Sequence, residues 1–337
     1  MTPVEALERV VHCLDRALES SFRVKAFIGA LDAVRAMPDD ELAKRIKGHT
    51  LTNVKGIGES SARVIEEAAA GGIPSYLVKL EAETAIPLSD AARPYRAALR
   101  GDCHLHSRWS DGGATIEAMA RTAQELGHEY MVLTDHSARL TVAHGLDRDR
   151  LLRQRDEVAE VNERIGNDFR ILHGMEVDIL LDGDLDLDDD LLGELDVVVA
   201  SVHSKLKMPH PEMTKRMVRA VRSPHVDILG HCTGRLIDKR APSSFDAAQV
   251  FAECAAHGTA VEINSRPERL DPPPELVRMA LDAGCWFSID SDAHATGQLE
   301  WQPYGCRRAA EAGVDPESIV NTWPSERLLA WTASHAS

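Results

Sequence analysis

The stretch DCHLHSRWSDG, Asp102 to Gly112, places two histidines one residue apart and then an aspartate beside a pair of glycines. Imidazole nitrogens and carboxylate oxygens are common ligands for zinc, manganese and iron. His104, His106 and Asp111 are therefore candidate metal ligands. Because a His-x-His pair is frequent by chance, the rest of the chain has to decide whether this stretch belongs to a metal site.

Apolar, strand-like runs along the chain end in the same kinds of side chain. Seven such runs are CHLH, YMVLTD, RILHGMEV, DVVVASV, VDILG, GTAVEI and CWFSID. The candidate ligands at or just beyond their ends are His104, His106, Asp111, His136, Glu176, His203, His231, Asp292 and His294. Asn264 ends the one run that lacks a ligand. A single histidine at a strand end is usually structural, but this many together indicate one metal centre.

The seven runs are separated by stretches that mostly have helical periodicity. Strands that alternate with helices indicate a parallel sheet with crossover helices. The pattern predicts an α/β domain over residues 93–337, a TIM-like distorted (β/α)7 barrel. In such barrels the functional side chains gather at the C-terminal ends of the strands, so the candidate ligands are expected to converge on one mouth.

Residues 1–92 have a different pattern and predict a separate all-α domain. VEALERVVHCLDRAL and FRVKAFIGALDAVRAM have apolar residues at helical spacing. VKGIGESSARVIEE then predicts a Gly-x-Gly hairpin that leads into a helix. The segment AIPLSDAARPYRAALRGD carries prolines without a strong period, and we interpret it as the linker.

The chemistry of the candidate ligands favours phosphate-ester hydrolysis. Imidazole and carboxylate without thiolate suit zinc, manganese or iron, and the size of the set implies two to three divalent ions. Ions a few Å apart activate water and stabilise the attacking and leaving oxygens of a displacement at phosphorus. Three ions bring about +6 against about −3 from Asp111, Glu176 and Asp292, so the loaded site attracts an anion. The chain has no Gly-x-Ser-x-Gly elbow and no Walker or Rossmann glycine loop.

The pieces HLHSRWSDG, LTDHS, GMEVDIL, VASVHS, DILGHCTGR, EINSRPERLD and SDAHAT resemble a PHP (polymerase and histidinol phosphatase) domain over residues 100 to 335. They are most similar to the C-terminal PHP domain of bacterial family X DNA polymerases. The resemblance implies three metal sites. Their ligands would be His104, His106, Glu176 and Asp292 for the first ion, Glu176, His203 and His231 for the second, and Asp111, His136 and His294 for the third. Glu176 would bridge the first two ions, and Glu176 and Asp292 are the expected catalytic carboxylates.

Arg235 follows His231 in the stretch GHCTGR and is a candidate phosphate clamp. The alternative interpretation is a structural ion pair. Asn264 is a candidate lining residue of the same mouth. We count Arg235 with Glu176 and Asp292 among the predicted catalytic residues.

The glycine hairpin near residue 56 resembles a helix-hairpin-helix motif, and residues 1 to about 85 are similar to the N-terminal 8-kDa-type domain of family X polymerases. Backbone amides at a helix N-terminus are suited to gripping a phosphate without reading bases. Lys55, Gly56, Gly58 and Arg63 are the candidate DNA-binding residues. The chain departs from the family twice, because no palm domain follows residue 90 and the lyase lysine is replaced by Val64. Polymerase and lyase activities are therefore not expected.

Charge and cysteine content limit the alternatives. Residues 1–100 hold 14 Lys+Arg and 14 Asp+Glu, so residues 101–337 carry the whole net charge of −16. Six scattered cysteines without a C-x-x-C pair predict buried reduced thiols. The acidic run LDGDLDLDDDLLGELD lacks the glycine and glutamate of a calcium loop and predicts a solvated loop. Without a membrane-length apolar run or a signal peptide, we expect a soluble cytoplasmic protein with no membrane partner.

Three hypotheses for function follow. The first is a metal-dependent DNA phosphodiesterase, a 3′→5′ exonuclease or a 3′-end or abasic-site processing enzyme of DNA repair that binds the DNA backbone without sequence specificity. The second is a phosphomonoesterase that acts on a small metabolite such as histidinol phosphate, although it has no obvious use for residues 1–90. The third is a non-catalytic DNA-binding scaffold, which the complete ligand set argues against. The sequence does not specify an oligomeric state.

Overall fold

The structure is a computed structural model that describes residues 1–335, and the chain divides into two compact units. The first unit contains Met1–Ile86 with the short segment Thr296–Gln298, and the second contains Pro87–Ala295 and the chain from Leu299 onward. The domain bounds and roles predicted for residues 1–92 and 93–337 stay predictions.

The first unit is helical, as its periodicity predicts. Its helices are α1 (Pro3–Arg16), α2 (Ser21–Arg35), α3 (Asp39–Lys47), α4 (Glu59–Ala69) and α5 (Ser75–Thr84), with a 3-10 turn at Leu51–Asn53. Thr2 and Glu5 form a reciprocal capping box that starts α1. Apolar side chains of α1, α2, α4 and α5 form one core, which includes Leu7, Val10 and Val64.

A tight hairpin precedes α4. Gly56 has a φ of 94°, in the left-handed region that favours glycine. A Cβ atom on Gly56 would lie 2.8 Å from the carbonyl oxygen of Gly29 in α2, so the hairpin backbone packs closely on that helix. The amide of Gly58 donates to the Ser61 hydroxyl at 3.0 Å at the start of α4. The predicted glycine hairpin is therefore present.

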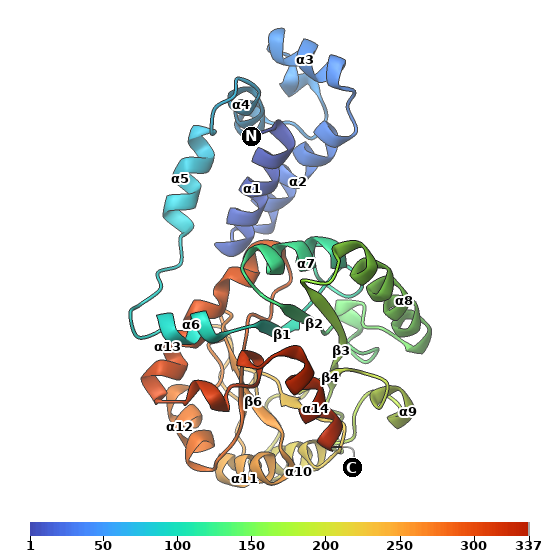
Figure 1. The fold of residues 1–337 in the computed structure, drawn as a ribbon, viewed down its shortest axis with the longest axis vertical. Helices are drawn as coiled ribbons and strands as arrows, with labels where there is room; N and C mark the ends of the chain where they lie inside the picture. The colour runs from blue at the N-terminus through green and yellow to red at the C-terminus, as the bar shows by residue number, and fades with distance from the viewer. Residues whose placement is uncertain (336–337) are drawn as a thin grey trace. The chain divides into compact units, whose positions relative to one another are not determined.

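The second unit is built on parallel strands that alternate with helices. The strands are β1 (Gly101–Leu105), β2 (Tyr130–Leu133), β3 (Arg170–Asp178), β4 (Val197–Ser201), β5 (Ile228–Leu229), β6 (Ala260–Asn264) and β7 (Phe287–Asp290). The helices are α6 (Arg93–Ala98), α7 (Ile116–Glu125), α8 (Arg148–Ile165), α9 (Asp189–Leu192), α10 (His210–Val221), α11 (Ala247–His257), α12 (Pro274–Asp282), α13 (Gln302–Ala312) and α14 (Ser325–His335). In Figure 1 the helices lie around the outside of the strands.

The strands form a seven-stranded sheet in the order β1 to β7, and each neighbouring pair is parallel. The sheet closes beyond its last strand, because Leu105 bridges Ala293 in parallel and the amide of His106 donates to the carbonyl of Ala293 at 2.8 Å. The predicted TIM-like distorted (β/α)7 barrel is confirmed. All strand C-termini therefore face one end, which we call the mouth.

The interpretation of residues 85–102 as a linker is partly wrong. Residues Arg93–Ala98 form helix α6, because Pro94 stands in its first turn where its missing N–H and fixed φ are tolerated. Ala92 and Leu99 on either side are buried in the barrel core, and Tyr95 donates to the carbonyl of Val314 at 2.8 Å. This stretch is part of the barrel unit and not a free connection.

Two composition-based predictions also have structural outcomes. All six cysteines are free and buried, as predicted. The acidic run after β3 forms turns and the short helix α9, and Asp182, Asp184 and Asp188 are exposed. Within residues 1–335, no helix combines the length and the apolar character needed to cross a membrane.

Candidate metal centre

The predicted ligands meet at the mouth of the barrel because each follows or ends a strand. His104 lies in β1 and Glu176 in β3, whereas the other ligands come within a few residues after β1, β2, β4, β5 and β7. Among residues 1–335, their donor atoms form four overlapping groups in which all atoms lie within 4.8 Å of one another. The groups are His106, Asp111, His136 and His294; His104, Glu176 and His231; His104, His106 and Asp292; and His136, Glu176 and His203.

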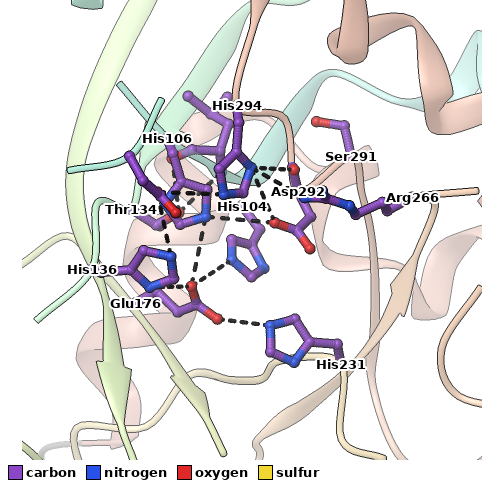
Figure 2. Close-up of polar contacts among 12 residues, drawn as sticks. His104, His106, Thr134, His136, Glu176, His231, Arg266, Ser291, Asp292 and His294 are labelled. Atoms are coloured by element: carbon purple, nitrogen blue, oxygen red, sulfur yellow. Dashed lines mark hydrogen bonds and ion pairs between the residues drawn. The ribbon is translucent and has the colours of Figure 1, made fainter. Parts of the chain in front are cut away.

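Glu176 is fully buried at the centre of this cluster (Figure 2). Its Oε2 atom lies 3.3 Å from Nε2 of His104 and 3.6 Å from Nε2 of His106. The same oxygen lies 2.8 Å from Nδ1 of His136. One carboxylate oxygen therefore faces a histidine of β1 and the histidines that follow β1 and β2.

The other oxygen of Glu176 faces a different pair of histidines. Its Oε1 atom lies 3.2 Å from Nε2 of His203 and 2.9 Å from Nε2 of His231. A carboxylate with each oxygen directed at a separate set of ligands has the geometry of a bridge. The predicted bridging role of Glu176 is consistent with this arrangement, and the assignment of each histidine to one ion stays a prediction.

A further group lies beside Glu176 at the loop after β1. Asp111 Oδ1 is 3.6 Å from Nε2 of His136 and 3.4 Å from Nε2 of His294. Asp292 Oδ1 is 3.6 Å from Nε2 of His106 and 3.6 Å from Nδ1 of His294. All predicted metal ligands thus belong to one continuous cluster.

The donor atoms fit divalent cations. Within residues 1–335, no hydrogen-bond partner exists for Nε2 of His104, either ring nitrogen of His106 or His203, or either carboxylate oxygen of Glu176. The short contacts of Glu176 with these rings are close in distance but not aligned as hydrogen bonds. Buried polar atoms without partners are costly, whereas lone pairs directed at a shared centre satisfy a metal ion. The residues present therefore suit the implied ions.

Burial and neighbouring charges set the protonation of the central ligands. Burial would raise the pKa of Glu176, but the charges of His104, His203 and His136 lower it well below its ordinary value. Burial lowers the pKa of His106 to about 3, and the neighbouring charges of His294 and His136 add to this effect. Near neutral pH, Glu176 is therefore ionised and His106 is neutral, the forms that bind a metal. At His203 burial lowers the pKa, but the nearby charges, chiefly that of Glu176, together outweigh burial and raise the pKa to about 9, so an ion that binds there displaces a proton.

Glu262 supports the cluster from β6 and was missed in the sequence. It is fully buried, its Oε1 atom accepts from Nδ1 of His104 at 2.8 Å, and its Oε2 atom accepts the backbone N–H of His231. The signal was present in the strand AVEIN, where Glu262 alternates with Val261 and Ile263 and so points to the opposite side of the strand.

Asp292 is held by Asn264 at the end of β6 and by Arg269 in the loop that follows. Arg269 Nε lies 3.1 Å from Asp292 Oδ2, and the Asn264 amide donates to the same oxygen at 3.2 Å. Asn264 thus lies at the mouth, as expected. Asp292 also has a φ of 54°, an uncommon conformation that its N–H to the His104 carbonyl, at 2.9 Å, helps to hold.

Asp135 fixes the turn that carries Asp111. It is fully buried and accepts from the Ser107 amide at 2.9 Å and the Ser107 hydroxyl at 2.6 Å. A Cβ atom on Gly112 would lie 2.7 Å from the Ser107 carbonyl, so only glycine allows this turn to close. Asp135 therefore acts as a support for a ligand loop.

Arg235 contacts the loop after β6. Its Nε donates to the carbonyl of Arg269 at 2.7 Å, and its guanidinium also donates to the carbonyl of Leu270. It therefore braces the loop that carries Arg269, and its role as a phosphate clamp stays a prediction.

The candidate DNA-binding residues lie in the first unit. Lys55, Gly56, Gly58 and Arg63 are all exposed around the hairpin and the first turns of α4. Val64 is fully buried in the helical core. DNA binding by these residues stays a prediction.

Comparison with known proteins finds one matching family and several similar proteins. Residues 102–266 match the PHP domain family. The DNA polymerase/3'-5' exonuclease PolX of Bacillus subtilis (strain 168) is 41% identical over 223 residues, which are 66% of this chain and 39% of that protein. The chain therefore spans well under half the length of this relative.

A further curated protein and a solved structure are each matched by this chain over most of their length. "Probable phosphatase Teth514_1060" of Thermoanaerobacter sp. (strain X514) is 28% identical over 233 residues, which are 66% of this chain and 89% of that protein. The crystal structure of histidinol phosphate phosphatase (HISK) from Lactococcus lactis subsp. lactis Il1403, complexed with Zn, L-histidinol and phosphate, has a TM-score of 0.47 and 16% identity. The match covers 64% of this chain and 94% of the chain in that crystal structure.

Proposed function

From the PHP domain over residues 102–266, a domain of metal-dependent phosphoesterases, we propose that this chain hydrolyses phosphodiester bonds of DNA. The reaction would be 3′→5′ exonuclease digestion or processing of a 3′ end or an abasic site in DNA repair. The observation that carries the proposal is the position of Glu176. Its two carboxylate oxygens lie within 3.6 Å of ring nitrogens of five histidines.

The chain's own residues would hold two to three ions of manganese, zinc or iron. His104, His106, Glu176 and Asp292 would bind the first, Glu176, His203 and His231 the second, and Asp111, His136 and His294 the third. When bound, such ions supply an activated water and stabilise charge during in-line attack at phosphorus. Glu262 and Asp135 keep the ligands in place, and the burial of Glu176 limits bulk water.

DNA as the substrate is supported by the first unit and by the PolX relative. The Gly56 hairpin leads into α4, and amides at a helix N-terminus are suited to a backbone phosphate. Lys55 and Arg63 are exposed beside it and add positive charge. We propose that this surface binds DNA through its backbone, without sequence specificity.

The second candidate is a phosphomonoesterase that acts on a small metabolite. It is favoured by the Thermoanaerobacter relative, because that protein is named a phosphatase and is covered over 89% of its length by this chain. A cytoplasmic location stays a prediction for either activity.

A digestion assay separates the two candidates. The protein of residues 1–337, with added Mn²⁺, is incubated with an oligonucleotide labelled at its 5′ end and, in parallel, with histidinol phosphate. A ladder that shortens from the 3′ end, with weak release of phosphate from histidinol phosphate, is the expected result. An intact oligonucleotide together with rapid release of phosphate would favour the metabolite phosphatase.

A further inference from the structure

Basic side chains surround the mouth of an otherwise acidic barrel. Four of them occur in the loops that follow β1, β2 and β4: Arg108, Arg139, Lys205 and Lys207. Each follows a predicted metal ligand on its own loop by two to four residues. Because each residue extends the chain by at most about 3.6 Å, every one of these Cα atoms lies within about 15 Å of a ligand's Cα atom.

These four side chains, which we call the basic rim, are exposed and have no partner of their own. None of them makes a side-chain hydrogen bond or an ion pair with any residue in the described range 1–335. Other cations at the same end are engaged. Lys239 pairs with Glu268 at 2.6 Å, and Arg240 donates to the Gly234 carbonyl at 2.6 Å. The charges of the basic rim thus remain available to a ligand.

The loop after β4 holds Lys205 and Lys207 in place. Arg216 is almost fully buried and donates to the carbonyls of Ser204 and Leu180, each at 2.8 Å. Leu206 packs against Gly234, where a Cβ atom would lie 2.7 Å from its Cδ2. The two lysines therefore flank an anchored leucine, and both are exposed.

Arg108 lines a hollow beside the metal centre. This hollow has a volume of about 450 Å³ and is also lined by Trp109, Ser110 and His144. Ser110 directly precedes the ligand Asp111. A volume of this size lies within the range of small-molecule sites and can take part of a nucleotide.

Carboxylates at the same end do not neutralise the basic rim. Asp184, in the loop after β3, pairs with Arg219, which lies on α10. Asp186 accepts the backbone N–H of Arg139 at 2.5 Å. The Arg139 guanidinium itself has no partner among the described residues.

We propose that the basic rim binds backbone phosphates of a polynucleotide strand that extend away from the bond being cut. A DNA strand carries one phosphate per roughly 3.4 Å of helix axis, so a strand whose scissile phosphate lies at the metal centre presents further phosphates to the rim. A small ester has only the phosphate at the metal centre and does not reach it. The basic rim therefore selects polymers over small esters, an inference that rests on the proposed DNA phosphodiesterase activity.

The test compares the hydrolysis of two substrates by the protein of residues 1–337 with Mn²⁺. The double variant Lys205→Gln, Lys207→Gln is matched by a control double variant, Arg170→Gln, Lys215→Gln. Arg170 starts β3 at the opposite end of the barrel, and Lys215 is exposed on α10. For each protein, kcat/KM is measured for a single-stranded oligonucleotide and for bis-p-nitrophenyl phosphate between 0.1 and 1 M salt.

Each lost contact with a single strand removes about 0.7 from the slope of log affinity against log salt. The Lys205→Gln, Lys207→Gln protein should therefore have a slope shallower by about 1.4. Its oligonucleotide-to-small-diester ratio, divided by the same ratio for wild type, should be roughly 25-fold lower at 0.1 M salt than at 1 M. An unchanged ratio, or an equal fall in the control double variant, would overturn the basic rim alone. A wild-type protein that cuts the small diester but no oligonucleotide would overturn the proposed function itself.

Discussion

Nδ1 of His104 and Oε1 of Glu262 lie 2.8 Å apart, and both side chains are fully buried. This hydrogen bond leaves Nε2 of His104 facing Glu176 at 3.3 Å. A carboxylate behind a ligating histidine fixes its tautomer and its ring orientation. Glu262 is therefore a positioning residue for the metal centre, although it is not itself a predicted ligand.

Glu262→Gln should lower the affinity for metal more than it lowers the rate of hydrolysis at saturating metal. Loss of such an outer carboxylate typically costs about 10- to 100-fold in metal affinity. The measurement is the Mn²⁺ concentration that gives half-maximal hydrolysis of bis-p-nitrophenyl phosphate. Glu253→Gln, on the exposed pair with Arg222, is the control. An unchanged Mn²⁺ requirement in Glu262→Gln would refute the positioning role.

The hairpin of the first unit should contribute to binding of long DNA. Charge reversal at Lys55 and Arg63 (Lys55→Glu, Arg63→Glu) should weaken affinity for duplex DNA and remove about two phosphate contacts from the salt dependence. Binding is measured by fluorescence anisotropy from 0.05 to 0.2 M salt. Lys79→Glu, on α5, is the control. Equal affinity and slope in all three proteins would show that the hairpin is not the DNA site.

Polymerase and lyase activities should be absent. Val64, at the position that we expect to match the lyase lysine of family X polymerases, is fully buried and offers no amine to an abasic site. Purified protein should neither extend a primer nor form a covalent adduct with abasic DNA after treatment with borohydride. A borohydride-stable adduct that disappears in Lys55→Ala would assign the lyase role to that exposed lysine instead.

A buried histidine away from the metal centre should make stability depend on pH. Burial and the charge of Arg96 lower the pKa of His128 to about 3. An unfolded histidine ionises near pH 6.5. Between these values the unfolded chain binds a proton that the folded chain does not, so the stabilisation is complete above pH 6.5 and declines as the pH falls toward 3.

His128→Gln should remove this dependence. The free energy of unfolding, measured with urea in excess chelator, should fall about 2 kcal/mol less in the variant than in wild type between pH 7 and pH 5. The chelator keeps the contribution of the metal ligands the same in both proteins. Parallel curves for the two proteins over this range would show that His128 is not the responsible group.

The ligands at the strand ends were predictable, because histidine or carboxylate side chains follow apolar, strand-like runs there. Each strand of the barrel is a short apolar run, and ligands such as His104, His203 and His231 stand at or just past its end. Parallel strands bring their C-termini to one end, so the convergence follows from the order of the elements. The predicted ligands could therefore be named without knowledge of their distances.

The supporting residues were harder to predict because their roles depend on neighbours distant in the chain. Glu262 lies inside a strand and meets His104 across 158 positions, and Arg269 lies in a loop without any period. Arg235 had a suggestive spacing from His231, yet its guanidinium turns to the carbonyls of Arg269 and Leu270. Helix α6 was missed because it has too few residues to show a period.

The central claim is that the cluster around Glu176 is a catalytic metal centre. The most direct measurement is hydrolysis of a labelled oligonucleotide by Glu176→Gln in saturating Mn²⁺, with circular dichroism to verify the fold. Because the lost carboxylate faces two sets of ligands, the rate should fall by more than about 100-fold, the upper end of what loss of an outer supporting group costs. Wild-type turnover in Glu176→Gln, or in wild-type protein stripped by excess chelator, would contradict the metal centre.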